Sequence, residues 1–275
     1  MPVPPYGHHL NEAMQTVATI VLWGGSLWLL AYAVRLARRE RSILPVMLWV
    51  SVAVGSIIEP LYDIAYHLLW YTPGQWTLFT SFGLPQPVWV MPAYIMVFGL
   101  PAMLLYRRLA AGADVAFVFK VAALLVCTTA FFETTANNVD LYGYYGGAPM
   151  RLLKYPLWIA FMEAAQITGF AVLCALLKRR AIKPVHYLAL IVVFPANFAF
   201  DVLGAGFPTI IAQNMPHPNT AVMWVSAFAS IVLAATALWW TAKLLLWDQR
   251  AHPEAAATAR SQPAPGARAR AFVRA

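Results

Sequence analysis

The stretch that decides the fold is residues 17–42, which read VATIVLWGGSLWLLAYAVRLARRERS. Residues 17–34 contain no charged side chain, and four arginines follow within the next seven positions. An apolar run of about 18 to 20 residues is long enough to cross a bilayer as a helix. Arginines directly after such a run favour the cytoplasmic side of the membrane. The stretch therefore predicts a membrane-spanning helix with a cytoplasmic carboxyl end.

Six further apolar runs follow it. The chain has 275 residues, of which 61% are hydrophobic and only 11% are charged, whereas soluble domains carry about 25% charged residues. We predict an all-α, polytopic membrane protein, with a bundle of seven transmembrane helices over residues 1–250 and a disordered basic tail over residues 251–275. The predicted helices are Val17–Val34, Ile43–Trp70, Val88–Tyr106, Val115–Glu133, Pro156–Leu177, Val185–Gly206 and Ala221–Leu246.

Lysine and arginine are concentrated in alternate loops. They cluster after the first, third and fifth helices and in the tail, whereas the other loops contain only Arg151 and Lys154. Positively charged loops stay in the cytoplasm. We therefore expect an outside N-terminus, a cytoplasmic C-terminus and a location in the plasma membrane, which in a bacterium is the inner membrane. The net charge of +8 then reflects topology and does not indicate a nucleic-acid partner.

The second predicted helix, Ile43–Trp70, is too long for one straight crossing. It contains Pro60, which lacks a backbone N–H and is expected to kink the helix. The predicted external loops Thr72–Pro87 and Asn138–Pro149 are rich in glycine and aromatic residues. Such loops either form a lid over a cavity or lie on the lipid surface, and the sequence leaves both arrangements open.

Acidic residues occupy unusual positions. Five of the eleven lie within apolar segments or at their outer ends. Charged side chains are costly in a bilayer, so each marks a candidate functional site. At 1.5 Å per residue, Glu59 and Asp201 lie about 24 Å above the cytoplasmic ends of their helices. All five are expected to meet in the outer half of the membrane, as candidate catalytic residues: Glu59, Asp63, Glu133, Glu163 and Asp201.

Other polar and aromatic side chains accompany these carboxyl groups. Residues three or four positions apart share a helix face, so Glu59, Asp63 and His67 are expected to point the same way. The same spacing pairs Asn197 with Asp201. We expect one cavity between the helices. Its candidate substrate-binding residues are Tyr62, Tyr66, His67, Phe132, Asn137, Gln166 and Asn197.

Few cations fall near this acidic layer. A carboxyl group without a counter-cation in a low-dielectric site favours its protonated form and then serves as a general acid. Aromatic residues make up 14% of the chain, and aromatic faces stabilise cations. The alternative is that the acids only bridge helices through hydrogen bonds and that the aromatic residues form the interfacial belt.

Several short motifs resemble a known family. The chain resembles bacterial membrane proteins of the avermectin-type spirocyclase family over about 60 to 70 residues around the second and fourth helices. The resemblance implies acid-promoted ring closure of a polyketide-like or isoprenoid-like substrate. The motifs are Glu59-Pro60 with Asp63, Pro73-Gly74-Gln75-Trp76, Gly83-Leu84-Pro85-Gln86-Pro87 with Trp89, Phe132-Glu133, and the run Tyr142–Gly146.

A looser similarity is to the integral-membrane terpene cyclases, which are small seven-helix proteins that need no metal. That resemblance implies protonation of an epoxide or alkene by a carboxylic acid on an early helix, with another acid on a late helix. Glu59 and Asp201 occupy comparable positions here. We therefore expect a cyclase of lipid-soluble substrates that enter from the bilayer, with Glu59 or Asp63 as the acid and Asp201 or Glu133 as the base.

Two other function classes remain open. Intramembrane carboxyl groups also form the proton relays of coupled transporters, and a lipid-binding or assembly protein needs no chemistry at all. We find no phosphate-binding loop and no histidine spacing that is diagnostic of a metal site, so we expect neither a metal nor another cofactor. Nothing in the sequence indicates an oligomeric state.

Overall fold

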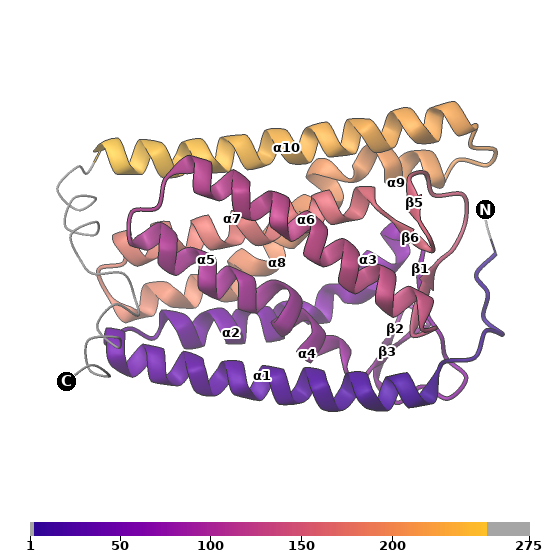
Figure 1. The fold of residues 1–275 in the computed structure, drawn as a ribbon, viewed down its shortest axis with the longest axis horizontal. Coiled ribbons are helices and arrows are strands. Elements are labelled where there is room, and N and C mark those ends of the chain that lie inside the picture. The colour runs from indigo at the N-terminus through magenta and orange to yellow at the C-terminus, as the bar shows by residue number, and fades with distance from the viewer. Residues whose placement is uncertain (1–2, 252–275) are drawn as a thin grey trace, which may run out of the picture.

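The computed structural model describes residues 3–251, and Figure 1 shows its ribbon. Within that range, seven helical segments are long and apolar enough to cross a membrane, which confirms the predicted all-α bundle of seven spans. Of the predicted tail, residues 252–275 lie outside the described residues. The spans are Glu12–Glu40 (α1), Leu44–Tyr66, Val90–Ala110, Val115–Asn138 (α6), Trp158–Arg180 (α7), Pro184–Ala205 and Thr220–Ala251 (α10).

Three of these spans are interrupted. Short 3₁₀ or π-helical turns divide them into shorter α-helices, and such turns often lie at functional sites. The second span contains α2 (Leu44–Gly55), a 3₁₀ turn (Ser56–Ile58) and α3 (Glu59–Tyr66). The third contains α4 (Val90–Tyr94), a π-helical turn (Ile95–Gly99) and α5 (Leu100–Ala110). The sixth contains a 3₁₀ turn (Pro184–Ala189), α8 (Leu190–Phe200) and a π-helical turn (Asp201–Ala205), and the short helix α9 (Phe207–Gln213) follows it.

The second span bends and ends as its sequence dictates. Its 3₁₀ turn lies directly before Pro60, which occupies the first turn of α3, where a missing N–H is tolerated. Helix α3 ends at Tyr66 because His67 adopts a left-handed conformation with φ of 54°. The expectation that this helix continues to Trp70 is therefore wrong. His67 does not extend the helical face of Glu59 and Asp63.

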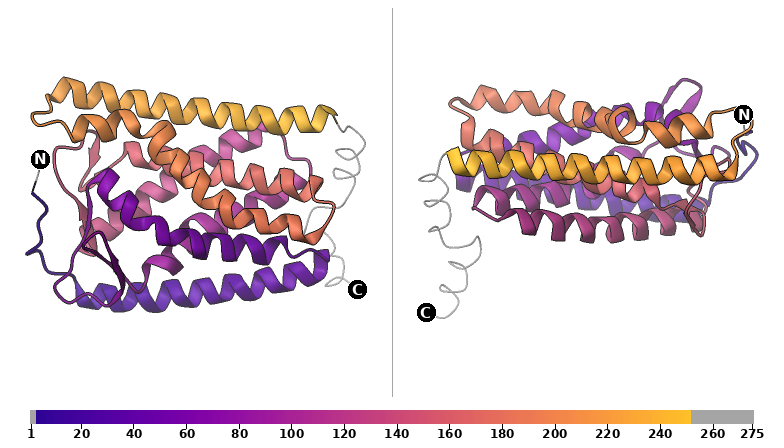
Figure 2. Two further views of the ribbon diagram at one scale, coloured as in Figure 1. Left: turned by 180° about the vertical axis from the view of Figure 1, so that it is seen from behind. Right: turned by 90° about the horizontal axis from the view of Figure 1, so that it is seen from above.

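Helix α7 forms the centre of the bundle. It is the most buried of the seven spans and packs against α5, α6 and α10. Helices α1 and α10 lie along opposite edges of the bundle (Figures 1 and 2). Helix α2 packs closely on α8, where the ring of Phe194 lies against Gly55 and leaves no room for a larger side chain.

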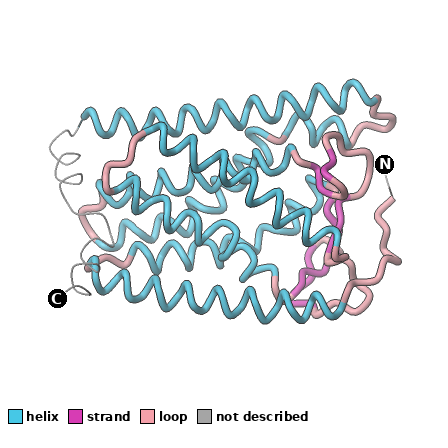
Figure 3. The backbone as a smooth tube through the Cα atoms, in the orientation of Figure 1, coloured by secondary structure: helices cyan, strands magenta, loops and turns pink. Residues whose placement is uncertain are grey.

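Six short strands gather at one end of the helices, which we call the strand end (Figure 3). They form three antiparallel pairs, and one of them joins segments far apart in the sequence by placing Trp70 opposite Tyr142. We call these six strands and the loops that join each pair the cap, and the two loops left open by the sequence are part of it. The pairs are β1 (Leu68–Trp70) with β4 (Tyr142–Tyr144), β2 (Thr77–Ser81) with β3 (Leu84–Pro87), and β5 (Arg151–Leu152) with β6 (Tyr155–Pro156).

Ion pairs tie the opposite, basic end together. Glu40 at the end of α1 pairs with Arg107 of α5 at 3.3 Å and with Lys178 of α7. Asp248 of α10 pairs with Arg179 at 2.9 Å and with Arg180 at 2.8 Å. These contacts fasten four spans to one another at the end where the arginine clusters lie.

Candidate functional site

All five predicted carboxyl groups are buried, each with an exposed fraction of 8% or less. They lie on four elements: Glu59 and Asp63 on α3, Glu133 on α6, Glu163 on the central helix α7, and Asp201 at the π-helical turn of the sixth span. Burial of so many acidic groups is expensive unless hydrogen bonds or protons compensate the charge.

Three of these carboxyl groups share one cavity, which we call the glutamate cavity. Glu59, Glu133 and Glu163 line it together with the predicted residues Tyr62 and Phe132. Its volume is about 40 Å³, measured as the space open to the centre of a water-sized sphere, so it has room for about three waters. The remaining walls are Leu68, Trp70, Trp89, Val90, Ala93, Tyr94, Val97, Phe98, Tyr142 and Tyr144.

Each glutamate in this cavity accepts a hydrogen bond from one tyrosine. The hydroxyl of Tyr94 donates to Glu59, that of Tyr144 donates to Glu133 at 3.0 Å, and that of Tyr155 donates to Glu163 at 3.4 Å. Tyr144 and Tyr155 belong to strands of the cap. Burial raises the pKa of both well above its usual value, so both keep the proton that they donate.

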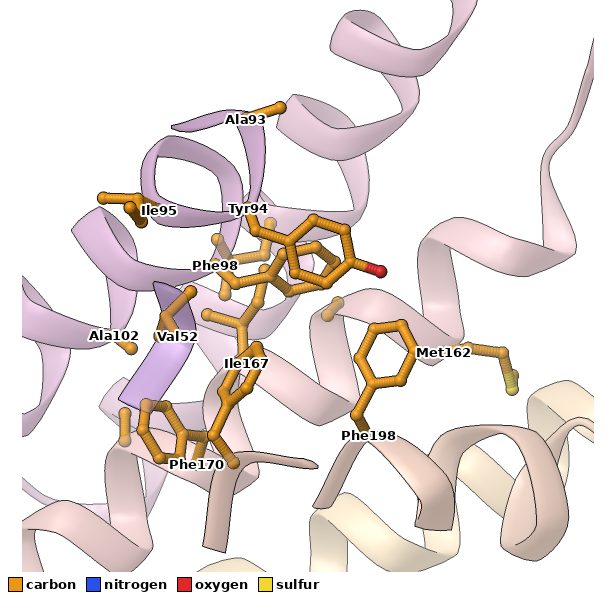
Figure 4. Packing of buried hydrophobic residues seen from close by; sticks show 14 of the residues in the cluster. Val52, Ala93, Tyr94, Ile95, Phe98, Ala102, Met162, Ile167, Phe170 and Phe198 are labelled. Atoms are coloured by element: carbon orange, nitrogen blue, oxygen red, sulfur yellow. The ribbon is translucent and has the colours of Figure 1, made fainter. Parts of the chain in front are cut away.

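Aromatic rings form most of the cavity wall. The rings of Trp70 and Trp89 meet edge to face at 5.0 Å, and Trp70 lies 4.6 Å from Tyr142. Behind this wall, Phe198 packs against Tyr94 (Figure 4), with ring centroids 5.6 Å apart, and against Tyr62, with ring centroids 4.9 Å apart. Among the described residues, no lysine, arginine or histidine lines the cavity. Its interior therefore combines acidic groups with π faces that favour a positive charge.

Asp63 lies one helical turn beyond Glu59 but does not line this cavity. Its Oδ2 accepts hydrogen bonds from the side chains of Gln86 at 2.6 Å and Trp70 at 3.2 Å. Both donors belong to the cap, so Asp63 anchors the cap to α3. His67 also lies outside the cavity, where it stacks on Tyr145 and contacts the side chain of Asn214 at 3.1 Å.

Two further predicted residues are buried next to the cavity without lining it. Asn137 is held by its own helix, since its side-chain amide donates to the backbone carbonyl of Glu133 at 2.8 Å. Tyr66 lies between Tyr62 and Trp158, with ring centroids 4.1 Å and 5.1 Å away. Its hydroxyl has no hydrogen-bond partner among the described residues.

The remaining predicted residues line a second cavity, which we call the amide cavity. Asp201, Gln166 and Asn197 face it together with Thr241 of α10, and its volume is about 30 Å³. No residue lines both cavities. Phe198 of α8 packs against Tyr62 and Tyr94 on the wall of the glutamate cavity. The single polar cavity expected from the sequence is therefore divided in two, because aromatic side chains fill the space between α3 and α8.

Sequence reasoning did not identify Tyr94 or Tyr155 as site residues. Tyr94 lies in an apolar run, and its importance follows only from the contact between α4 and α3. Tyr155 is brought to Glu163 by the β5–β6 hairpin. A tyrosine inside or next to an apolar run was the available signal, but this chain contains 12 tyrosines, and the sequence alone does not select these two.

Comparison of the chain with protein-family models, with curated proteins and with solved structures returned no match. Within residues 3–251, no three His, Cys, Asp or Glu side chains are grouped so that they could hold a metal ion.

Proposed function

We propose that this protein is a membrane-embedded, acid-catalysed cyclase of a lipid-soluble isoprenoid-like or polyketide-like substrate. The observation that carries the proposal is the glutamate cavity: three buried carboxyl groups, each with a tyrosine donor, surrounded by aromatic rings. Such a site supplies a proton in a water-poor environment and stabilises the cation that protonation creates. The resemblance to spirocyclases and membrane terpene cyclases supports the same reaction class.

In the proposed mechanism, Glu59 donates its proton to an epoxide, alkene or carbonyl oxygen of the substrate. The faces of Trp70, Trp89 and Phe98 stabilise the resulting cation while the new ring bond forms. Glu133 then removes a proton from the product cation, and Glu163 supports the exchange. One proton enters and one leaves, so an isomerising ring closure needs no further reactant.

The substrate has to enlarge the site before it reacts. Pockets for organic ligands typically measure about 300 to 1,000 Å³, and the glutamate cavity of about 40 Å³ is far smaller. The cap residues Leu68, Trp70, Tyr142 and Tyr144 form the wall that we expect to move. An apolar groove of about 680 Å³ along α6 and the β5–β6 hairpin provides a route by which the substrate approaches from the bilayer.

The test is mass spectrometry of lipid extracts from host cells that lack the gene and are complemented with wild type or Glu59→Gln. We expect a metabolite that changes retention, at unchanged mass or by one water, with wild type only. Glu12→Gln makes the same substitution at an exposed acid and is the matched control. If Glu59→Gln inserts normally and still gives the product, Glu59 is not the acid.

A coupled transporter is the second candidate, because one observation favours it. The sixth span is interrupted at Asp201, and interrupted helices with a buried acid form the ion sites of many transporters. Dependence of substrate flux on an ion gradient, with no chemical change in the substrate, would select this function. If function survived neutralisation of all five acids, a non-catalytic lipid-binding or assembly role would replace both.

A further inference from the structure

The amide cavity contains buried polar atoms that the protein does not satisfy. Asp201 is 3% exposed and Gln166 is 4% exposed. Both carboxylate oxygens of Asp201, and both the oxygen and the nitrogen of the Gln166 side-chain amide, have no hydrogen-bond partner among residues 3–251. Buried polar groups are almost always paired, and a bound ion or water is one reason why a buried group has no partner in the protein.

Oxygen atoms dominate the polar lining of this cavity. The side-chain amide nitrogen of Asn197 donates to the backbone carbonyl of Gln166 at 2.8 Å, which leaves its Oδ1 for the cavity. The hydroxyl of Thr241 donates to the carbonyl of Ala237 at 2.8 Å, which leaves its lone pairs free. Asp201, Gln166, Asn197 and Thr241 therefore offer carboxylate, amide and hydroxyl oxygens to one small space.

The single carboxylate of this cavity has to be balanced by one positive charge. Asp201 is the only acidic residue that lines the cavity, and no lysine, arginine or histidine of the described chain faces it. An isolated carboxylate in a low-dielectric interior is strongly destabilised unless a cation or a proton neutralises it. Hard oxygen ligands suit alkali and alkaline-earth cations, whereas the absence of thiol and imidazole groups from the lining disfavours transition metals.

The volume of the amide cavity and the backbone at Asp201 further restrict which cation fits. A volume of about 30 Å³ holds about two water-sized species, enough for a small ion and one water. A single carboxylate balances a monovalent ion, whereas calcium sites usually combine several carboxylates. The π-helical turn Asp201–Ala205 begins at the acid itself, and irregular helices are common at ion sites in membrane proteins.

We infer that the amide cavity is a binding site for a small monovalent cation, Na⁺, held by Asp201 with the oxygens of Gln166, Asn197 and Thr241. The ion neutralises Asp201 and fastens the sixth span to α7 and α10. This site is separate from the glutamate cavity, and it exists whether or not the protein is a cyclase.

Thermal unfolding of the purified full chain in detergent micelles tests the inference. The melting temperature is measured as NaCl replaces choline chloride at constant ionic strength. A ligand that binds only the folded state raises this temperature in a saturable way, so we expect a saturable rise with wild type. Asp201→Asn should abolish the rise, and Thr241→Val should weaken the apparent Na⁺ affinity about fivefold, the typical effect of losing one neutral ligand.

Glu163→Gln is the matched control, because it neutralises an equally buried carboxyl that lines only the other cavity. It should keep the full Na⁺ dependence. If Asp201→Asn does not fold, equilibrium dialysis with radiolabelled Na⁺ measures binding directly. Wild type should then bind Na⁺ and Thr241→Val should bind it more weakly. Equal melting temperatures in Na⁺ and choline, or an unchanged response in Asp201→Asn, would show that the cavity holds only a proton or water and would overturn the inference.

Discussion

The side-chain amide of Gln86 donates a hydrogen bond of 2.6 Å to the carboxyl group of Asp63. Gln86 lies at the end of strand β3 and Asp63 lies on α3, and both side chains are almost fully buried. This contact, together with the bond from Trp70 to the same oxygen, fixes the cap above the glutamate cavity.

We expect Gln86→Met to destabilise the protein by about 1 to 3 kcal/mol, because it leaves a buried carboxyl oxygen with one donor fewer. Chemical denaturation in detergent measures the effect. Gln75→Met is the control, since the side chain of Gln75 in the same loop accepts an exposed hydrogen bond from Thr77 and has no other hydrogen-bond partner among the described residues. Equal stability of the two variants would show that Asp63 does not anchor the cap.

We expect Tyr94→Phe to slow product formation about tenfold, the typical effect on a rate of losing one hydrogen bond to a carboxyl group. Tyr94 orients Glu59 and is therefore a positioning residue. Its loss should lower kcat while leaving KM nearly unchanged, because the ring that contacts the substrate remains. Tyr187→Phe, at a tyrosine in the 3₁₀ turn that begins the sixth span, should change neither constant. A rise in KM alone would assign Tyr94 to substrate binding instead.

The ion pairs at the two ends of the bundle should differ in strength. The side chain of Glu40 is 20% exposed and contacts two cations, whereas that of Asp140 is 37% exposed where it pairs with Lys154. We expect Glu40→Gln to destabilise by about 1 to 3 kcal/mol and Asp140→Asn by less than about 1 kcal/mol. Chemical denaturation at low and high salt checks both values, and a larger effect at Asp140 would contradict this ranking.

The protein should become less stable as the pH is lowered, because His67 becomes protonated in the unfolded state more readily than in the folded state. Burial lowers the pKa of His67 below its usual value, and the contact with Asn214 only partly opposes this. The folded state therefore binds this proton less readily than the unfolded state does. The stabilising contribution is complete above the usual histidine pKa of about 6.5 and is lost as the pH falls below it.

We therefore expect the melting temperature to drop between pH 7 and pH 5, and His67→Gln to drop less. His217→Gln, at an exposed histidine of the loop before α10, is the control and should follow the wild type. If both variants showed the same pH dependence as wild type, burial of neutral His67 would not contribute to stability.

The charge pattern predicts that the strand end faces outwards and the basic end faces the cytoplasm. A fluorescent protein that matures only in the cytoplasm should therefore become fluorescent when it is fused to the C-terminus. It should stay dark when it is fused to the N-terminus, which is expected to lie outside. Replacement of Arg35, Arg38, Arg39 and Arg41 by glutamine should weaken this preference. If only the N-terminal fusion were fluorescent, the orientation of the protein would be the opposite of the predicted one.

Much of the fold was predictable from local sequence. Each of the seven spans is an apolar run whose length matches the bilayer, and a run of that kind has few alternatives to a helix because its backbone groups must pair internally. The burial of Glu59, Asp63, Glu133, Glu163 and Asp201 followed from the same runs. The bend near Pro60 followed from the chemistry of proline.

The sequence alone thus determined which segments cross the membrane and which acids they bury, since both depend on residues close together in the chain. Only the tertiary structure decided how those acids are grouped. It placed Glu59 with Glu133 and Glu163, turned Asp63 towards Gln86, and set Asp201 in a separate cavity. These arrangements depend on the rotation of each helix and on strand pairs such as Trp70 with Tyr142, which arise from packing between distant segments and leave no local pattern.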